Sequence, residues 1–151
     1  MIHLLVVHVM SYQTTNEDFK AALRTVKQHL KKNGKFIFDF WYGPAVMSEK
    51  PEARVKKLEG EDYTVERFAD PVWKEKENIV EVNYRVLVSA KENGIQHEIK
   101  ETHSMRYFFL PEIKLLLESE GLVMEHCEEW MKGNELSAKS WNALVIAGLN
   151  E

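Results

Sequence analysis

Cysteine is almost absent from this chain of 151 residues, and so are several other signals that would assign a class of protein. Cys127 is the single cysteine, which excludes an internal disulfide framework and a zinc site built from several cysteines. Basic residues are not in excess, because 24 Asp and Glu oppose 20 Lys and Arg. We therefore expect a reducing, cytoplasmic environment and no nucleic-acid partner.

Long apolar runs and nucleotide-binding glycine motifs are missing as well. The run LLVV at 4–7 is far shorter than the ~20 residues of a membrane span, and no basic segment of a signal peptide precedes it. The seven glycines form neither G-x-G-x-x-G nor a P-loop. The sequence thus predicts no membrane partner and no standard dinucleotide or P-loop turn.

Metal and hydrolase sites also lack support. The six histidines are scattered, and His97 and His103, on one face of a strand, would lie about 20 Å apart. No nucleophile-elbow motif occurs, and Cys127 lies in a strand-like run. We expect no metal ligands.

The composition that is present, 44% apolar and 29% charged, is that of a globular protein. Its length suits a single domain over residues 1–151.

The first forty residues have a strand–helix–strand pattern. Leu4 to Val7 form a continuous apolar run, typical of a strand buried on both faces. Thr14 and Glu17 have capping-box spacing for a helix over about 15–32, and Gly34 suits its left-handed C′ position. KFIFDFWYG at 35–43 predicts a second buried strand. Two parallel strands joined by a helical crossover are therefore expected.

The middle of the chain alternates apolar and polar residues with a period of two. The alternation is clear over 80–88 and 95–107 and weaker within 53–69, and Asn93-Gly94 suits a type I′ turn. We expect an antiparallel sheet of about three strands with one wet face. A helix from Pro111 to Gly121 and two apolar strands, 122–129 and 141–149, then close the chain.

Ligands of an open α/β sheet bind outside the carboxyl ends of its parallel strands. HVMSYQ and DFWYGP follow these ends, and they carry side chains with apolar bodies and polar tips, namely His8, Tyr12, Trp41 and Tyr42. Each has a structural alternative: His8 could bond only to backbone, and the aromatic rings could pack under the middle sheet. Asp39 lies between phenylalanines and needs a partner if it is buried. It could make a structural hydrogen bond, or it could be a perturbed carboxylate near a cleft.

LLVVHVMSYQTTNEDFKAALRTVKQHLKKNGKFIFDFWYG resembles the region from the fourth to the fifth strand of class I S-adenosylmethionine-dependent methyltransferases that act on small molecules. ETHSMRYFFLPEIKLLLESEGL looks like the end of the sheet that these enzymes often insert after strand five, followed by their last helix. The resemblance covers nearly the whole chain. It implies an α/β fold with parallel strands, a final antiparallel strand and an inserted antiparallel sheet.

One departure from the family is large. The first three strands of such enzymes, with a glycine-rich cofactor turn and an acidic ribose-binding residue, have no counterpart here. The resemblance therefore implies a truncated Rossmann-like sheet, the carboxyl-terminal half from strand four onward. Residues 1–48 and 108–151 would form the partial core and 49–107 the insert. S-adenosylmethionine is the implied cofactor, although this chain alone is expected to be inactive.

The matching positions imply roles for individual residues. Val7 and His8 match the strand end that borders the methionine part of the cofactor, and His8, then Tyr12, would be the catalytic base. The residues that match the rim where a small-molecule acceptor docks are Trp41, Tyr42, Arg106 and Tyr107.

Two other readings stay open. The chain could be a non-enzymatic, self-associating remnant, or a small-ligand-binding module built on the middle sheet. Without the first three strands, residues 3–8 would form a bare apolar edge. We therefore expect a homodimer that pairs this segment with its copy, or a partner that supplies the missing half.

Overall fold

The computed structural model describes residues 3–150, which divide into two compact units. The first unit is Met1–Lys50 with Met105–Glu151, and the second is Pro51–Ser104. Among the described helices, none has both the length and the apolar character to span a membrane.

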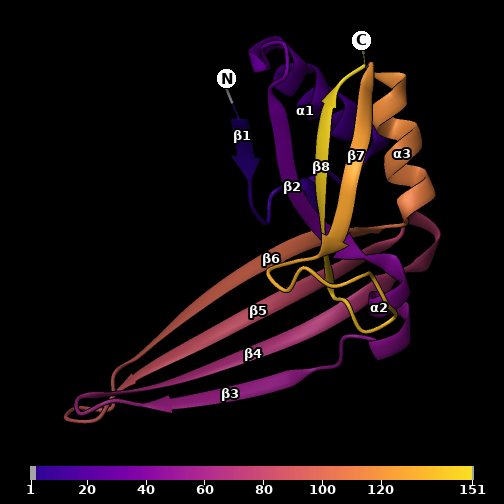
Figure 1. The fold of residues 1–151 in the computed structure, drawn as a ribbon. Coiled ribbons are helices and arrows are strands. Elements are labelled where there is room, and N and C mark those ends of the chain that lie inside the picture. Colours follow the sequence, from indigo (N-terminus) through magenta and orange to yellow (C-terminus); the bar gives the residue numbers. More distant parts are fainter. Residues whose placement is uncertain (1–2, 151) are drawn as a thin grey trace. The chain divides into compact units, whose positions relative to one another are not determined.

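The sheet of the first unit is mixed. β1 (His3–Val6) runs parallel to β2 (Lys35–Tyr42), with Leu4 opposite Phe36, and α1 (Asn16–His29) connects them. β8 (Asn142–Leu149) pairs antiparallel with β2, and β7 (Leu122–Glu129) pairs antiparallel with β8 (Figure 1). The parallel opening pair and the final antiparallel strand are thus as predicted.

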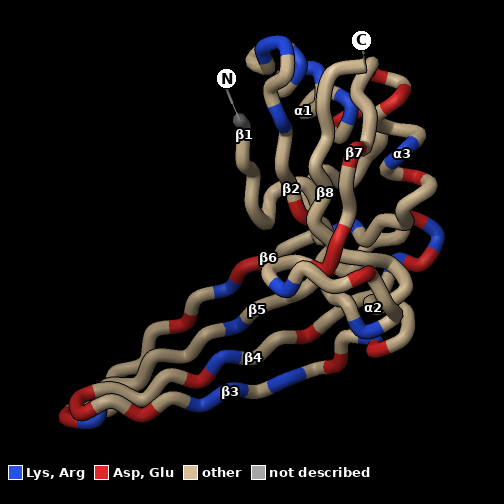
Figure 2. Tube along the Cα trace, in the orientation of Figure 1, with Lys and Arg blue, Asp and Glu red and all other residues tan. Residues whose placement is uncertain are grey.

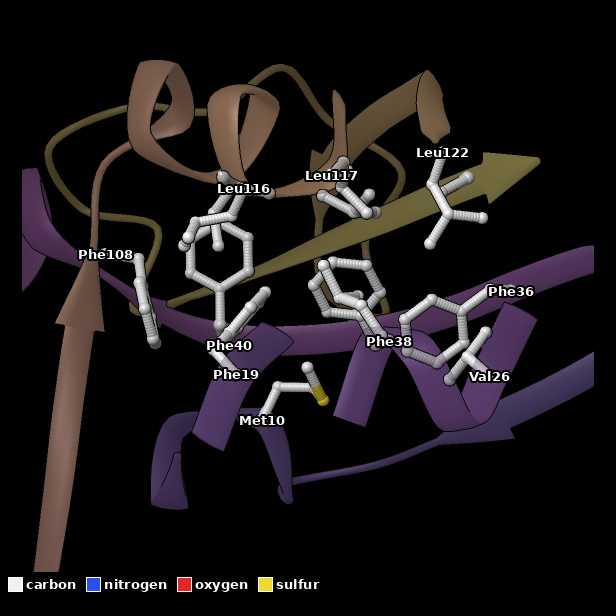
Figure 3. Close-up of a cluster of buried hydrophobic side chains, with 14 of the residues drawn as sticks. Met10, Phe19, Val26, Phe36, Phe38, Phe40, Phe108, Leu116, Leu117 and Leu122 are labelled. Atoms are coloured by element: carbon white, nitrogen blue, oxygen red, sulfur yellow. The ribbon is translucent and has the colours of Figure 1, made fainter. Parts of the chain in front are cut away.

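Alternate residues of β2 build the core of this unit. Phe36, Phe38 and Phe40 are at most 1% exposed, and they share a face with the small residues of β8 that lie opposite them. α1 and α3 (Leu110–Ser119) cover this face with Phe19, Leu117 and their neighbours (Figure 3). The alternate apolar residues of β2 and the helically spaced apolar residues of α1 therefore pack together at one interface.

The ends of α1 differ from the sequence-based expectation. Thr15, and not Thr14, is the N-cap, because its hydroxyl accepts a hydrogen bond from the Asp18 amide at 3.1 Å. At the other end α1 ends at His29, with Leu30 as an extended C-cap, three residues before the predicted end. The positive φ of 63° belongs to Asn33, in the turn that follows the helix, and not to Gly34. The N-cap thus lies one residue and the helix end three residues from their predicted places, shifts that spacing alone does not resolve.

β1 also departs from expectation, because it is not buried on both faces. Leu5 is 60% exposed and Val7 37%. Among the described strands β1 pairs only with β2, so β1 lies at an edge of the sheet and its side chains lack a second layer of cover. The continuous apolar run is therefore correct for a strand but wrong for its burial.

The second unit contains more strands than the three expected. Its strands follow the order β3 (Arg54–Glu59), β4 (Tyr63–Lys74), β5 (Ile79–Ala90) and β6 (Gln96–Phe108), with a 3₁₀ turn at Glu75–Glu77. The weak strand predicted within 53–69 is in fact two antiparallel strands, β3 and β4. β6 continues into the first unit, where Trp41 lies opposite Tyr107 in a parallel pair.

The turn between β5 and β6 is not the predicted type I′. That type needs positive φ at two central residues, whereas Gly94 has φ 67° and Asn93 is not among the positive-φ residues. The loop is longer, since the Gly94 amide donates to the Ala90 carbonyl and the Ala90 amide to the Ile95 carbonyl.

Two short elements were not predicted from the sequence. A 3₁₀ turn, η1 (Met10–Tyr12), follows β1, and α2 (Gly43–Glu49) follows β2. Gly43 permits close packing here, because a Cβ atom would lie 2.7 Å from the Phe109 ring. The predicted helix after Pro111 is present as α3, and Gly121 beyond it has φ 75°.

Candidate functional site

The carboxyl ends of β1 and β2 bring His8 and Asp39 together. Val6 lies opposite Phe38 in the parallel register. The chain that leaves β1 therefore passes Asp39, the residue that follows Phe38 in β2. His8 has φ 54°, a left-handed conformation that is uncommon outside glycine and that recurs at functional sites. In this conformation the His8 amide donates to Asp39 Oδ1 at 2.5 Å.

The imidazole of His8 makes a second contact with the same carboxylate. His8 Nδ1 lies 2.7 Å from Asp39 Oδ2, and the two side chains are 58% and 1% exposed. Because a carboxylate oxygen accepts, the contact assigns the proton of the neutral ring to Nδ1. Nε2 is then the nitrogen with the free lone pair on an exposed ring.

Asn142, the first residue of β8, completes the environment of the carboxylate. Its Nδ2 donates to Asp39 Oδ2 at 3.1 Å and lies 3.3 Å from His8 Nδ1. The buried carboxylate therefore has the partners that its burial requires. Asn142 Oδ1, in contrast, is buried without a hydrogen-bond partner among the described residues.

Aromatic side chains surround this polar group. Trp130 meets His8 edge-on, with ring centroids 5.9 Å apart, and Trp41 meets Trp141 at 5.3 Å. A shallow depression of about 280 Å³ is lined by Glu129, Trp130, Lys132, Lys139, Trp141 and Asn142. The surface beside His8 thus combines indole rings with charged and amide side chains.

Tyr12 and Tyr42 occupy different surroundings. Tyr12 is 45% exposed on η1, and η1 is tied to β2 because the Trp41 amide donates to the buried Ser11 Oγ at 2.8 Å. Tyr42 is half-buried, and this burial raises the pKa of its phenol, with a further contribution from Cys127. Burial likewise raises the pKa of the Cys127 thiol to about 11, so at neutral pH the thiol is protonated and a weak nucleophile.

Arg106 is buried, at 7% exposed, and its guanidinium is held by several groups of the first unit. Nη2 donates to Asn16 Oδ1 at 2.8 Å and to the Glu112 carboxylate, and the guanidinium lies 4.6 Å from the centre of the Phe108 ring. The side chain therefore joins the start of α1 to the first turn of α3. Its Nε is buried without a hydrogen-bond partner in the described part of the chain.

Tyr107 is also buried, at 1% exposed, and packs edge-on against Phe109. Of the predicted site residues, the structure thus places His8 and Tyr12 on accessible surface and Arg106 and Tyr107 in the interior. Within residues 3–150 there is no cluster of three or more metal-ligating side chains.

Sequence reasoning missed Asn142, Trp130 and Trp141. They come from the end of β7, the loop after it and the start of β8, more than 100 residues after His8, and no local spacing connects them to it. Asp39 was recognised as a buried carboxylate in need of a partner, although its partner was not identified.

Solved structures with a similar fold are S-adenosylmethionine-dependent methyltransferases. One from Clostridium acetobutylicum matches with a TM-score of 0.81 at 15% identity, over 99% of this chain and 58% of its own. The sugar N-methyltransferase KedS8 from a Streptoalloteichus species matches at 0.74, with 16% identity over 99% of this chain and 56% of its own. The S-adenosylmethionine-bound amino pentose methyltransferase CalS10 from Micromonospora echinaspora matches at 0.67 and 17% identity, over 95% of this chain and 56% of its own.

No protein-family model and no curated protein matches the sequence. The chain spans less than two thirds of the length of these structural neighbours. At this level of identity the likeness concerns the fold, and it confirms the α/β class with a mixed sheet. The chain has the fold of S-adenosylmethionine-dependent methyltransferases.

Proposed function

We propose that these 151 residues are the acceptor-side, carboxyl-terminal part of a class I S-adenosylmethionine-dependent methyltransferase that acts on a small molecule. The fold matches such enzymes over 99% of the chain at a TM-score of 0.81. The observation that carries the proposal is the exposed His8 ring oriented by the buried Asp39. This pair lies at the carboxyl ends of parallel strands, where ligands of open α/β sheets bind.

His8 is the general base of the proposed reaction. Its Nε2 would take a proton from an O–H or N–H group of the acceptor, which leaves that atom with a free lone pair as the nucleophile. The Asp39 carboxylate holds the ring by Nδ1 and stabilises the imidazolium after proton transfer, and the Asn142 amide holds the carboxylate. Tyr12, exposed on η1 beside β2, is the second candidate for proton transfer or for binding the acceptor hydroxyl.

The residues present fit only part of a cofactor site. Val7 is exposed at the end of β1 and borders, together with His8, the place for the methionine part. No glycine-rich turn for the adenosine part occurs in these 151 residues. When bound, the cofactor supplies an electrophilic methyl group on a sulfonium sulfur.

The acceptor docks against the aromatic rim in this proposal. Trp41 and Tyr42 present amphipathic rings at the end of β2, which suits an acceptor with both apolar and polar groups. Arg106 and Tyr107 border this region from the interior: Arg106 positions the start of α1, and Tyr107 supports Trp41 through the β2–β6 pair.

The proposal includes a partner and a location. The outer edge of β1 takes up the same segment of a second copy, residues 3–8, or a polypeptide with the cofactor-binding half, because Leu5 is 60% exposed there. The single cysteine, which leaves no internal disulfide to form, suits a reducing, cytoplasmic environment.

Calorimetric titration of S-adenosylmethionine into the pure chain tests the cofactor part of the proposal. We expect no binding tighter than about 100 µM, a binding free energy of roughly −5.5 kcal/mol. Sequencing of the DNA immediately upstream should find codons for a glycine-rich strand–turn–helix, in frame or frame-shifted.

The outcomes separate the alternatives. Tight binding by the chain alone would contradict the partial site and support a complete one. No binding, together with upstream DNA that lacks such codons, would contradict the methyltransferase proposal. It would favour a non-enzymatic, self-associating protein, a function to which the exposed apolar edge of β1 also points.

A further inference from the structure

The sheet of the second unit has a mainly apolar face and a mainly polar face, and the polar face also carries the exposed Val55 and Val72. Residues directly opposite each other on paired strands share a face. Leu58, Val65 and Val88 form one such row, and the row beside it holds Lys56, Arg67 and Val86. The opposite face carries most of the charged and amide side chains, namely Lys57, Glu59, Glu66, Asp70, Glu81, Asn83 and Arg85.

Side-chain contacts assign the residues of β6 to these faces. Thr102 Oγ1 donates to Asn83 Oδ1 at 2.8 Å, and Gln96 Nε2 donates to Ser89 Oγ at 3.2 Å, which places the even-numbered residues on the polar face. Ile99 and Glu101 therefore lie on the apolar face. The edge-on contact of His103 with Tyr84 agrees, because both belong to that face.

The apolar face is open to solvent along much of its length. Leu58 and Tyr63 are each 54% exposed and Ile99 is 50% exposed. Within residues 51–104, all of which the structure describes, Val80 and Val82 are the only buried positions. An exposed apolar sheet face of this size marks an interaction surface rather than a solvated one.

The charges of this face lie at its opposite edges except for Arg67, which stands on β4 with its guanidinium 4.4 Å from the centre of the Tyr84 ring. Arg54 and Lys56 stand on β3, the outer strand on one side, and Glu101 stands on β6 on the other side. Figure 2 shows charged residues along both strands. Arg54 and Glu101 are at about the same level along the strands. Across the paired strands Arg54 lies opposite Ala69, and Ala69 lies opposite Tyr84. Asn83, next to Tyr84, accepts a hydrogen bond from Thr102, which is next to Glu101.

This arrangement is complementary to itself. A two-fold axis parallel to the strands places β3 of one copy over β6 of the other, so Arg54 faces Glu101 twice per dimer. The apolar rows between them then face each other, as in a sheet-on-sheet sandwich with layers about 10 Å apart. Four strands of about seven residues cover roughly 24 Å by 19 Å. Two facing copies therefore approach the ~1,000 Å² of a specific interface.

We propose that the apolar face of the second unit, defined by Leu58, Tyr63, Val65, Val86, Val88 and Ile99, binds the same face of a second copy through paired Arg54–Glu101 contacts. This surface is distinct from the edge of β1. It uses side chains of the sheet face, whereas the edge uses backbone groups of residues 3–8.

Sedimentation velocity from about 1 to 100 µM tests the proposal in a Leu5→Lys background, which blocks association through β1. The protein should sediment as a dimer of 17.7 kDa chains. Arg54→Glu or Glu101→Arg alone should weaken the dimer about tenfold or more, because each creates two like-charge pairs per dimer. The double variant Arg54→Glu/Glu101→Arg should return within about threefold of the parent affinity.

Lys100→Glu is the matched control, since it reverses a charge on the polar face of β6, and it should leave the dimer unchanged. Circular dichroism of each variant checks that the fold is intact. A monomer throughout the concentration range would overturn the proposal. So would a dimer that is insensitive to both single reversals, or a double variant that associates no better than the singles.

Discussion

His8 and Asp39 show how one residue of a pair limits what the other can do. The carboxylate accepts from the backbone amide, the imidazole and the Asn142 side chain. It thereby fixes both the ring and the strained backbone turn that carries it. Since these contacts use Nδ1, the basic nitrogen of His8 must be Nε2.

The tautomer of His8 is therefore a direct prediction. In long-range ¹H–¹⁵N spectra recorded about two pH units above the ordinary histidine pKa, we expect His8 to carry its proton on Nδ1. Asp39→Asn removes the charged acceptor and should shift part of the population toward the Nε2–H form, as expected when a carboxylate that orients a histidine is lost.

Glu128→Gln provides the control for this experiment. Glu128 contacts exposed His126 at 2.8 Å, so this substitution should alter the signals of His126 and leave those of His8 unchanged. An Nε2–H tautomer of His8 in the unmodified protein would contradict its assignment as the base, and so would spectra that are insensitive to Asp39→Asn.

At the level of residues, the sequence identified the two members of the pair but not their contact. His8 stood at a predicted strand end and Asp39 in a predicted buried strand, 31 residues apart. Their contact depends on the register of β1 against β2, which no local pattern encodes. Asn142 lies 103 residues beyond Asp39, and its role depends on the antiparallel return of β8.

The elements of the first unit follow the periodicity of the sequence closely. β7 occupies the predicted 122–129, and β8 begins one residue after the predicted 141. Their positions follow from apolar alternation against a helix-covered face. Helix ends were less predictable, because Thr14 and Thr15 both offer a hydroxyl and only the backbone angles decide between them.

Substitution of each threonine tests which one caps α1. Thr15→Ala removes the acceptor for the Asp18 amide and should lower the free energy of unfolding by about 1 kcal/mol in urea denaturation. Thr14→Ala is the matched control, because within residues 3–150 the hydrogen bond to Thr14 is accepted by its backbone carbonyl, from Arg106, and not by its hydroxyl. It should change stability by less than about 0.5 kcal/mol. Equal losses for both variants, or a larger loss for Thr14→Ala, would contradict the assignment.

For the whole molecule, the two exposed apolar regions require explanation together. Among the described strands β1 pairs on one side only, and its Leu5 side chain is exposed. In the second unit, the mainly apolar face of the sheet is exposed to solvent. The composition gave no hint of either, because 44% apolar residues are ordinary for a globular chain. The solvent exposure of a strand depends on which other strands and helices pack against it, and that is a property of the assembled sheet.

Hydrogen exchange at β1 tests how its edge is used. In a monomer, about half of the amides in a strand that pairs on one side only point to solvent and exchange rapidly. If residues 3–8 pair with a second copy, those amides should become at least tenfold slower as the concentration rises from about 1 to 100 µM. Leu5→Lys should abolish this dependence, since it places like charges side by side across the two-fold axis.

Arg54→Glu is the informative control for this measurement, because it weakens association through the second unit without touching β1. The concentration-dependent protection of residues 3–8 should persist in that variant if the two surfaces are independent. Fast exchange at every concentration would show that no copy covers the edge. A polypeptide with the proposed cofactor-binding half would then be the remaining candidate to pair with β1, because an apolar strand edge of this kind is rarely left bare.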